Sequence, residues 1–260
     1  MRKLCADFHT HTTYCDGKST PRQMVEAAYS MGLTDFGISG HADYSMWEPG
    51  FGMSDAILSA YKQELEILRE EYAGKMNIYI GIELDTLGPV QQAEYAIGST
   101  HSVLKDGHLV TVDDTEEKLV QAVETLWNGD WYAMARDYFE LEATVYDKLH
   151  CDWVGHFDLL TKFNEGYKHF DETKDAYLEP ALAALAAQNG SEEEIKELEY
   201  ILKELEGLIR DKKDYSEKDS QFHAQIATCS HNRVMTNLIP VITEGVCVFA
   251  DSVEETEYGQ

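Results

Sequence analysis

Side chains that could bind a metal ion stand at the ends of several short apolar runs of this sequence. They are His9, His11, His41, Glu83, His101 and His156. Neutral imidazoles and carboxylates are good ligands for Zn²⁺, Mn²⁺ or Fe²⁺, and a carboxylate can bridge two ions. A single histidine such as His156 is more often an ordinary hydrogen-bonded residue, but five apolar runs that all end in His or Glu make chance a poor explanation. The pattern therefore predicts a metal site.

The apolar runs have the character of β-strands separated by helices. The predicted strands are Leu4–Phe8, Asp35–Ser39, Asn77–Leu84, Tyr95–Ser99 and Trp153–Gly155. The first predicted helix begins at Thr20, which is an N-cap followed by Pro21 and Gln23. Three further helices are predicted over roughly Ser54–Tyr72, Thr115–Trp127 and Ala133–Leu149. This alternation predicts a parallel α/β sheet or barrel. The carboxyl ends of barrel strands open on one face, so the candidate ligands would meet there.

The sequence changes character near Lys174. No convincing strand occurs over residues 174–238, and Ser191 and Glu194 form a capping box before an amphipathic helix that runs to Arg210. The second part is therefore predicted to be all-α. These features place a domain boundary near residue 175, between domains 1–175 and 176–260.

The composition narrows the class of protein. Of 260 residues, 43% are hydrophobic, which is enough for a packed core, and the formal charge is −27. Such an acid excess argues against nucleic acid as a partner. No apolar run approaches the roughly 20 residues of a membrane helix, and the first residues lack the apolar stretch of a secretory signal. Five scattered cysteines, without a CxxC pair, are expected to be reduced thiols in a cytoplasmic protein.

Five phrases of the sequence, in order, resemble the polymerase-and-histidinol-phosphatase (PHP) superfamily. They are ADFHTHTTYCDGKSTPRQMVEAAYSMGL, FGISGHADYS, IYIGIELD, AIGSTHSV and DWVGHFDLLTKFNEGY. The resemblance extends from about Ala6 to Tyr177 and is nearest to the histidinol-phosphatase branch. It implies a distorted, TIM-like β/α barrel of seven strands, with two or three divalent ions (Zn, Mn or Fe), that hydrolyses a small phosphorylated substrate such as histidinol phosphate.

The resemblance also implies roles for individual residues. It implies that His9 and His11 bind one ion with Glu83, that Glu83 bridges to a second ion held by His101 and His156, and that His41 binds a third with Asp16. Asp16 precedes a glycine, and such a pair is also an ordinary turn. Arg136 and Lys162 are candidates to bind the substrate phosphate, although either could be a solvated surface residue.

The sequence departs from the PHP pattern after Tyr177. The resemblance implies two more strands and a final Asp-x-His motif, and this motif does not occur. The barrel is therefore expected to be incomplete. Val246–Ala250 with Asp251 could imitate the last strand, although a helix or a loose tail is the ordinary interpretation. An open barrel exposes sheet edges, which the helical part or a second copy in a homodimer could cover.

The residues that follow resemble part of an FCD domain, the helical ligand-binding domain of GntR-type regulators, over about 178–250. Asp219 and His223, four residues apart, match its first pair of metal ligands, and an ordinary surface ion pair is the alternative. Three hypotheses result: a metal-dependent phosphatase with activity impaired or intact, a metal-binding module without catalysis, and an effector-binding domain of the FCD type.

Overall fold

The computed structural model describes residues 5–166, 168–171, 183, 185–187, 189–231 and 236. The described residues fall into two units. The first unit consists of the described parts of Met1–Asp130 and Thr144–Gly166, and the second of Trp131–Ala143 and the described residues from Lys168 onward. The boundary near residue 175 stays a prediction.

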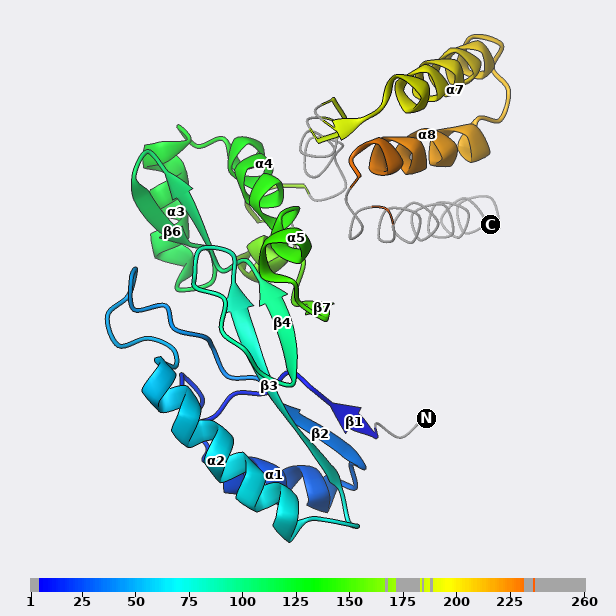
Figure 1. Cartoon of the computed structure of the whole chain (residues 1–260). Helices are drawn as coiled ribbons and strands as arrows, with labels where there is room; N and C mark the ends of the chain where they lie inside the picture. Colours follow the sequence, from blue (N-terminus) through cyan, green and yellow to red (C-terminus); the bar gives the residue numbers. More distant parts are fainter. Residues whose placement is uncertain are drawn as a thin grey trace, which may run out of the picture. The chain divides into compact units, whose positions relative to one another are not determined.

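The first unit contains a sheet of five parallel strands that curls into a half-barrel (Figure 1). The strands are β1 (Ala6–Asp7), β2 (Asp35–Ile38), β3 (Asn77–Asp85), β4 (Tyr95–Ser99) and β7 (Trp153–Val154). Their order in the sheet, β1-β2-β3-β4-β7, follows the order of the chain. The predicted incomplete β/α barrel, followed by an all-α segment, is confirmed.

Two helices of the first unit, α1 (Pro21–Met31) and α2 (Asp55–Glu71), cover one face of the sheet (Figure 1). The first begins as predicted, because Gln23 N donates to Thr20 Oγ1 at 3.3 Å and Thr20 N donates to Gln23 Oε1 at 2.9 Å. The unit also contains α3 (Glu116–Leu126), α5 (Val145–Leu149) and a short 3₁₀ helix over Leu159–Phe163.

The longest strand, β3, has apolar core residues on one face and the predicted ligand Glu83 on the other. Ile78, Ile80, Ile82 and Leu84 are all at most 3% exposed and belong to the cluster of apolar side chains contributed by α1 and α2. Because side chains alternate along a strand, Tyr79, Gly81, Glu83 and Asp85 lie on the opposite, inner face of the half-barrel. The apolar half of the strand fixes its register and so fixes the position of Glu83.

Glycine on the inner face makes room for an aromatic ring. A Cβ atom added at Gly81 would lie 2.1 Å from Cζ of Tyr95, and one added at Gly37 would lie 2.2 Å from its hydroxyl oxygen. That hydroxyl donates to Phe8 O at 2.7 Å. The Tyr95 ring therefore ties β4 to the chain just after β1, beneath the ends of the strands.

Gly81→Ala should accordingly destabilise the protein by about 1–3 kcal/mol, because neither the ring nor the sheet can give way without cost. The urea midpoint measures this change. Gly207→Ala is the matched control, since a Cβ atom there meets nothing within 4 Å. Alanine favours a helix interior more than glycine, so the control should be stabilised by up to about 1 kcal/mol. Equal midpoints for Gly81→Ala and the wild type would contradict this packing.

Two features differ from the elements expected from the sequence. An antiparallel hairpin, β5 (Ser102–Lys105) and β6 (His108–Thr111), follows β4. Its turn residues Asp106 and Gly107 both have positive φ, 49° and 81°, as a two-residue type I′ turn requires. The prediction of a single helix over Ala133–Leu149 is wrong, because the structure has two separate helices there, α4 (Trp131–Glu142) and α5. The β-branched pair Thr144 and Val145 lowers helix propensity at the break.

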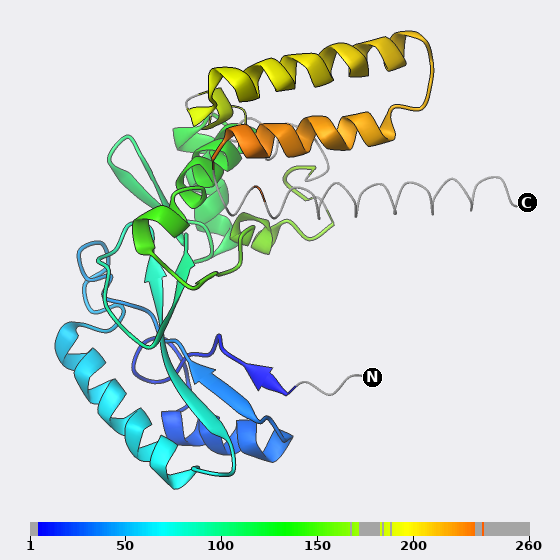
Figure 2. The ribbon, with the colours of Figure 1, turned by 45° about the vertical axis from the view of Figure 1, so that its right-hand side comes forward.

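The second unit is helical where it is described. Besides α4 it contains α7 (Glu192–Arg210) and α8 (Ser216–Cys229), which lie side by side in both views (Figure 2). The predicted capping box is present, since Glu194 N donates to Ser191 Oγ and Ser191 N donates to Glu194 Oε2. Val246–Ala250 and Asp251 lie outside the described residues. Among the helices that the structure describes, none has the length and apolarity needed to cross a membrane.

Candidate metal centre

The six predicted ligands come together in the first unit, at the carboxyl ends of its parallel strands. His9 and His11 follow β1, and His41 follows β2 and pairs with Glu83 as a parallel bridge. Glu83 lies near the end of β3, His101 follows β4 and His156 follows β7. The parallel sheet therefore brings these side chains together at the ends of its strands, as the sequence pattern predicts.

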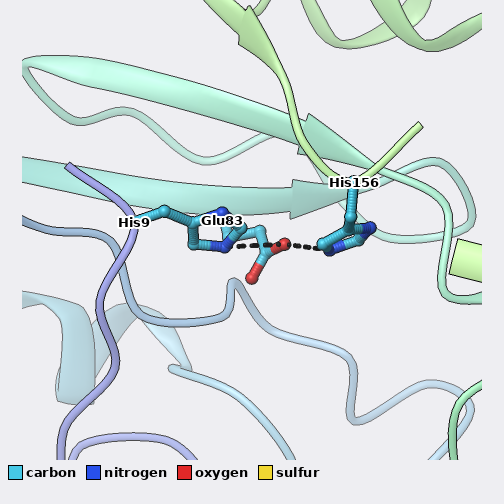
Figure 3. A group of neighbouring side chains, drawn as sticks. All are labelled: His9, Glu83 and His156. Carbon is cyan, nitrogen blue, oxygen red and sulfur yellow. Dashed lines mark hydrogen bonds and ion pairs between the residues drawn. The ribbon is translucent and has the colours of Figure 1, made fainter. Parts of the chain in front are cut away.

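All five imidazoles are directed at one buried carboxylate. Glu83 is 1% exposed. Its Oε1 atom lies 3.0 Å from His156 Nε2, 3.2 Å from His9 Nε2 and 3.4 Å from His101 Nε2. Its Oε2 atom lies 3.2 Å from His11 Nε2 and 3.2 Å from His41 Nδ1. Figure 3 shows His9 and His156 approaching the same oxygen from opposite sides.

The imidazoles also contact one another and form a ring around the carboxylate. Consecutive centroids are separated by 5.4, 4.5, 5.0, 4.8 and 5.7 Å in the closed order His9, His11, His41, His101, His156 and back to His9. Such crowding of basic groups around one acid is unusual for a structural core, because each protonated imidazole would repel its neighbours.

Two polar side chains that the sequence did not predict hold this arrangement in place. Asp85 Oδ2 accepts hydrogen bonds from His101 N at 3.0 Å and lies 2.9 Å from His101 Nδ1. Ser99 Oγ donates to Glu83 Oε1 at 2.7 Å. Asp85 and Ser99 are register partners on β3 and β4. Asp85 follows Glu83 by two residues and so lies on the same face of the strand. This spacing could have identified Asp85 from the sequence.

Asp16 contacts two histidines of the ring, His11 and His41. Its Oδ1 atom is 3.1 Å from His11 Nδ1 and its Oδ2 atom is 3.6 Å from His41 Nε2. Cys15 Sγ is 3.5 Å from the same His11 nitrogen. The loop is compact because Cys15 N and Gly17 N both donate to Thr12 O at 3.0 Å. Asp16 is thus a turn residue whose carboxylate lies close enough to His11 and His41 to bind the same ion.

The charges of the site are strongly coupled. Burial alone would raise the pKa of Glu83, but its contacts with the histidines hold that pKa well below the usual value. Burial would lower the pKa of His11, yet contacts with Cys15 and Glu83 raise it to about 10. Burial acts in the same direction on His101, and contacts with Asp85 and Glu83 raise its pKa to about 10. The contact with His41 lowers the pKa of Asp16.

The donor set fits divalent cations. His101 Nδ1 lies 2.9 Å from Asp85 Oδ2 and its Nε2 atom lies 3.4 Å from Glu83 Oε1, so without an ion the ring must be protonated on both nitrogens to satisfy the two carboxylates, as its raised pKa indicates. Glu83 Oε2 is buried and no contact to it from the described residues has hydrogen-bond geometry. Leaving such an oxygen unsatisfied costs about 1–3 kcal/mol. Cations between the imidazoles and the carboxylate would replace the protons of the rings and satisfy Glu83 Oε2.

Within the described residues, three groups of ligand atoms are close enough to hold one ion each. They are His9 with Glu83 and His156, His41 with Glu83 and His101, and His11 with Asp16 and His41. This grouping differs from the pairing that the resemblance implies, because His9 is grouped with His156 and not with His11. Glu83 is shared between two groups in both schemes, which suits a bridging carboxylate.

The remaining predicted residues do not belong to these three groups of ligands. Lys162 Nζ donates to Asp113 O at 2.8 Å, and Arg136 is exposed on α4, in the second unit. His223 Nε2 lies 3.6 Å from Asp219 Oδ2 on α8. In the described part of the chain, neither of these last two residues belongs to a group of three or more potential metal ligands.

Asp85→Asn should weaken metal binding by about 10–100-fold, because the amide no longer supplies the charge that orients His101. Competition with a fluorescent zinc chelator measures the affinity. Asp147→Asn, at an exposed position of α5, is the control and should bind metal like the wild type. Unchanged affinity in Asp85→Asn would show that Asp85 does not support the site.

Comparison with known proteins identifies two matching domain families and several relatives. The sequence model of the PHP domain matches residues 7–190, and that of the FCD domain matches residues 176–258. A protein assigned as a histidinol-phosphatase in Deinococcus radiodurans is 28% identical over 176 residues, which cover 63% of this chain and 64% of that protein. The histidinol-phosphatase of Bacillus subtilis is 26% identical over 186 residues, which cover 60% of this chain and 67% of that protein.

The fold has a counterpart among solved structures. The crystal structure of a protein assigned as a histidinol phosphatase from Listeria monocytogenes superimposes with a TM-score of 0.57 at 20% sequence identity. The superposition covers 70% of this chain and 77% of that one. The match at residues 7–190 includes the described strands, apart from Ala6 at the start of β1, and all six converging side chains. The chain belongs to the PHP domain family.

Proposed function

We propose that this protein is a metal-dependent phosphomonoesterase of the histidinol-phosphatase type, with two or three divalent ions (Zn, Mn or Fe) held by the ring of histidines, Glu83 and Asp16. The observation that carries the proposal is the convergence of five imidazole nitrogens, each within 3.4 Å, on the carboxylate of Glu83.

The residues would divide the work as follows. Glu83 directs its two oxygens at separate sets of imidazoles, so one carboxylate would hold neighbouring ions. Asp85 and Ser99 fix the orientations of His101 and Glu83 before substrate arrives. When bound, the ions would supply Lewis acidity for hydrolysis of a phosphate ester.

Relatives suggest the substrate. The two curated proteins described above are named for histidinol phosphate, and the first of them is matched over 64% of its length. L-histidinol phosphate is therefore the first small phosphorylated substrate to test. The proposed products are L-histidinol and inorganic phosphate.

Phosphate release by metal-reconstituted protein tests the proposal. The protein is freed of metal, reloaded with Zn²⁺ or Mn²⁺, and assayed with L-histidinol phosphate beside other phosphomonoesters. Turnover is expected in the reloaded wild type and not in His101→Ala. His108→Ala, at an exposed position of β6, is the matched control and should keep full turnover. Protein that binds metal but releases phosphate from none of the esters would refute the activity and leave the metal centre standing.

A second candidate function concerns the helical unit. The match of residues 176–258 to the FCD domain, together with the contact between Asp219 and His223, favours binding of an effector there. Isothermal titration with Zn²⁺ would show one weaker class of site lost in His223→Ala. Identical titrations for the variant and the wild type would refute this second role.

A further inference from the structure

A pocket opens beside the metal centre within the first unit. Its volume is about 350 Å³, and His41, Glu83 and His101 form the wall on the side of the metal centre. Ser102 and Thr111 of the β5–β6 hairpin contribute to the lining. This is where a substrate would contact the ions of the proposed centre.

The lining carries little positive charge of its own. Among the described lining residues Lys118 is the single lysine or arginine, and it is ion-paired with Asp114. Asp43, Glu48 and Asp113 also line the pocket. A phosphate group that enters must therefore rely on the ions of the centre and on neutral hydrogen-bond donors.

Tyr44 supplies such a donor. Its side chain lines the pocket and is 7% exposed. Within the part of the chain that the structure describes, no contact of its hydroxyl has hydrogen-bond geometry, and the side chains of Ser102 and Asp85 lie close enough to influence its pKa. Leaving a buried hydroxyl unpaired costs about 1–3 kcal/mol, so a ligand that accepts from it would recover this energy.

The position of Tyr44 is fixed by its neighbours. Tyr44 N donates to Phe51 O at 3.2 Å, and Tyr44 O accepts from Glu48 N at 3.0 Å. The Tyr44 ring meets the Phe51 ring edge-on at 6.3 Å, and Phe51 in turn lies 5.0 Å from the ring of His41. The hydroxyl thus belongs to a segment that also contacts a predicted metal ligand.

The Tyr44 hydroxyl should act as a hydrogen-bond donor in neutral and mildly alkaline solution. Burial, reinforced by the negative charge of Asp85, raises the pKa of Tyr44 well above its ordinary value. The phenol therefore stays protonated in neutral and mildly alkaline solution.

We infer that Tyr44 is a substrate-binding residue that donates its hydroxyl hydrogen to a phosphoryl oxygen of the ester in this pocket. The inference rests on the proposed function for the identity of the substrate. It assigns the recognition of phosphate to a neutral phenol beside the ions, in place of the Arg136 and Lys162 expected from the sequence.

Tyr44→Phe tests the inference through three measurements on metal-loaded protein. Binding of inorganic phosphate, followed by titration calorimetry, should weaken about tenfold, as loss of one good hydrogen bond predicts. KM for the hydrolysed ester should rise by a similar factor. Metal content should not change, and the melting temperature should stay the same or rise, because no contact of the hydroxyl with the described residues has hydrogen-bond geometry.

Tyr61→Phe is the matched control for stability. The Tyr61 hydroxyl is buried and lies 2.5 Å from Ile38 O and 2.9 Å from Gly81 O, so its removal should lower the melting temperature. Wild-type phosphate affinity in Tyr44→Phe would overturn the inference. So would a fall in its melting temperature or metal content, which would mean that the hydroxyl serves the protein structure.

These outcomes are separable from failure of the proposed function. If no ester is hydrolysed but inorganic phosphate binds the metal-loaded wild type more tightly than Tyr44→Phe, the Tyr44 site stands and the enzyme activity does not. If the metal-loaded wild type binds no phosphate, the Tyr44 site is refuted.

Discussion

Glu83→Gln is expected to weaken metal binding by more than 100-fold and to reduce phosphate release to background. Residues that only support a metal ligand typically contribute about 10–100-fold, and Glu83 is a proposed direct ligand shared by two ions. Glutamine has nearly the same shape but no charge, and its amide nitrogen would face imidazole nitrogens that now lie 3.0–3.4 Å from the carboxylate.

Metal content after dialysis against a defined concentration of Zn²⁺ measures this effect. Glu26→Gln, at an exposed position of α1, carries the same chemical change outside the site and should match the wild type. Circular dichroism would establish that both variants are folded. A folded Glu83→Gln variant with wild-type metal content would be incompatible with a bridging role for Glu83.

The affinity of the ion at His11 and that of the ion at His101 are each expected to increase by about tenfold per pH unit between pH 7 and 8.5, because the two rings belong to different groups of ligands. In the metal-free protein the pKa values of His11 and His101 are raised to about 10, so both rings are protonated in this range. An ion needs the neutral ring, and filling both groups must therefore release two protons, one for each ion. Each released proton makes the apparent affinity tenfold higher per pH unit, and the dependence levels off only above the raised pKa values.

Titration calorimetry in buffers with different ionisation enthalpies counts the released protons. Two per chain are expected from these rings near pH 8. With His11→Ala the count should fall to one, which assigns the proton to the residue. A binding enthalpy independent of the buffer would contradict the raised pKa values.

The positions of the ligands could be predicted because two independent patterns coincide in the sequence. Short apolar runs mark the strands, and His or Glu stands where each run ends. Parallel pairing then brings His9 and His156 together although 147 positions, from 9 to 156, separate them in the chain. This much follows from strand geometry alone.

The grouping of the ligands could not be predicted in the same way. It depends on how the loops after β1 and β2 pack, for example on the contact of the His11 and His41 rings at 4.5 Å. Loop packing depends on tertiary contacts that a sequence pattern does not contain. The roles of Asp85 and Ser99 depend likewise on the register that pairs them.

The sequence contains a signal for the hairpin that forms part of the pocket wall, and the prediction did not use it. Asp106–Gly107 stands between two β-like runs and is the usual turn of a two-residue hairpin. Its strands supply Ser102 and Thr111 to the pocket. The functional importance of Tyr44 had no comparable signal, because it depends on burial and on the lack of a hydrogen-bond partner among the described residues.

The central claim is that Glu83 bridges neighbouring metal ions. Anomalous X-ray diffraction at the zinc absorption edge, from crystals of the zinc-loaded protein, tests it most directly. Two or three anomalous peaks are expected within the ring of histidines, with two of them at bonding distance from the two carboxylate oxygens of Glu83. A map with no peak at bonding distance from this carboxylate would contradict the claim.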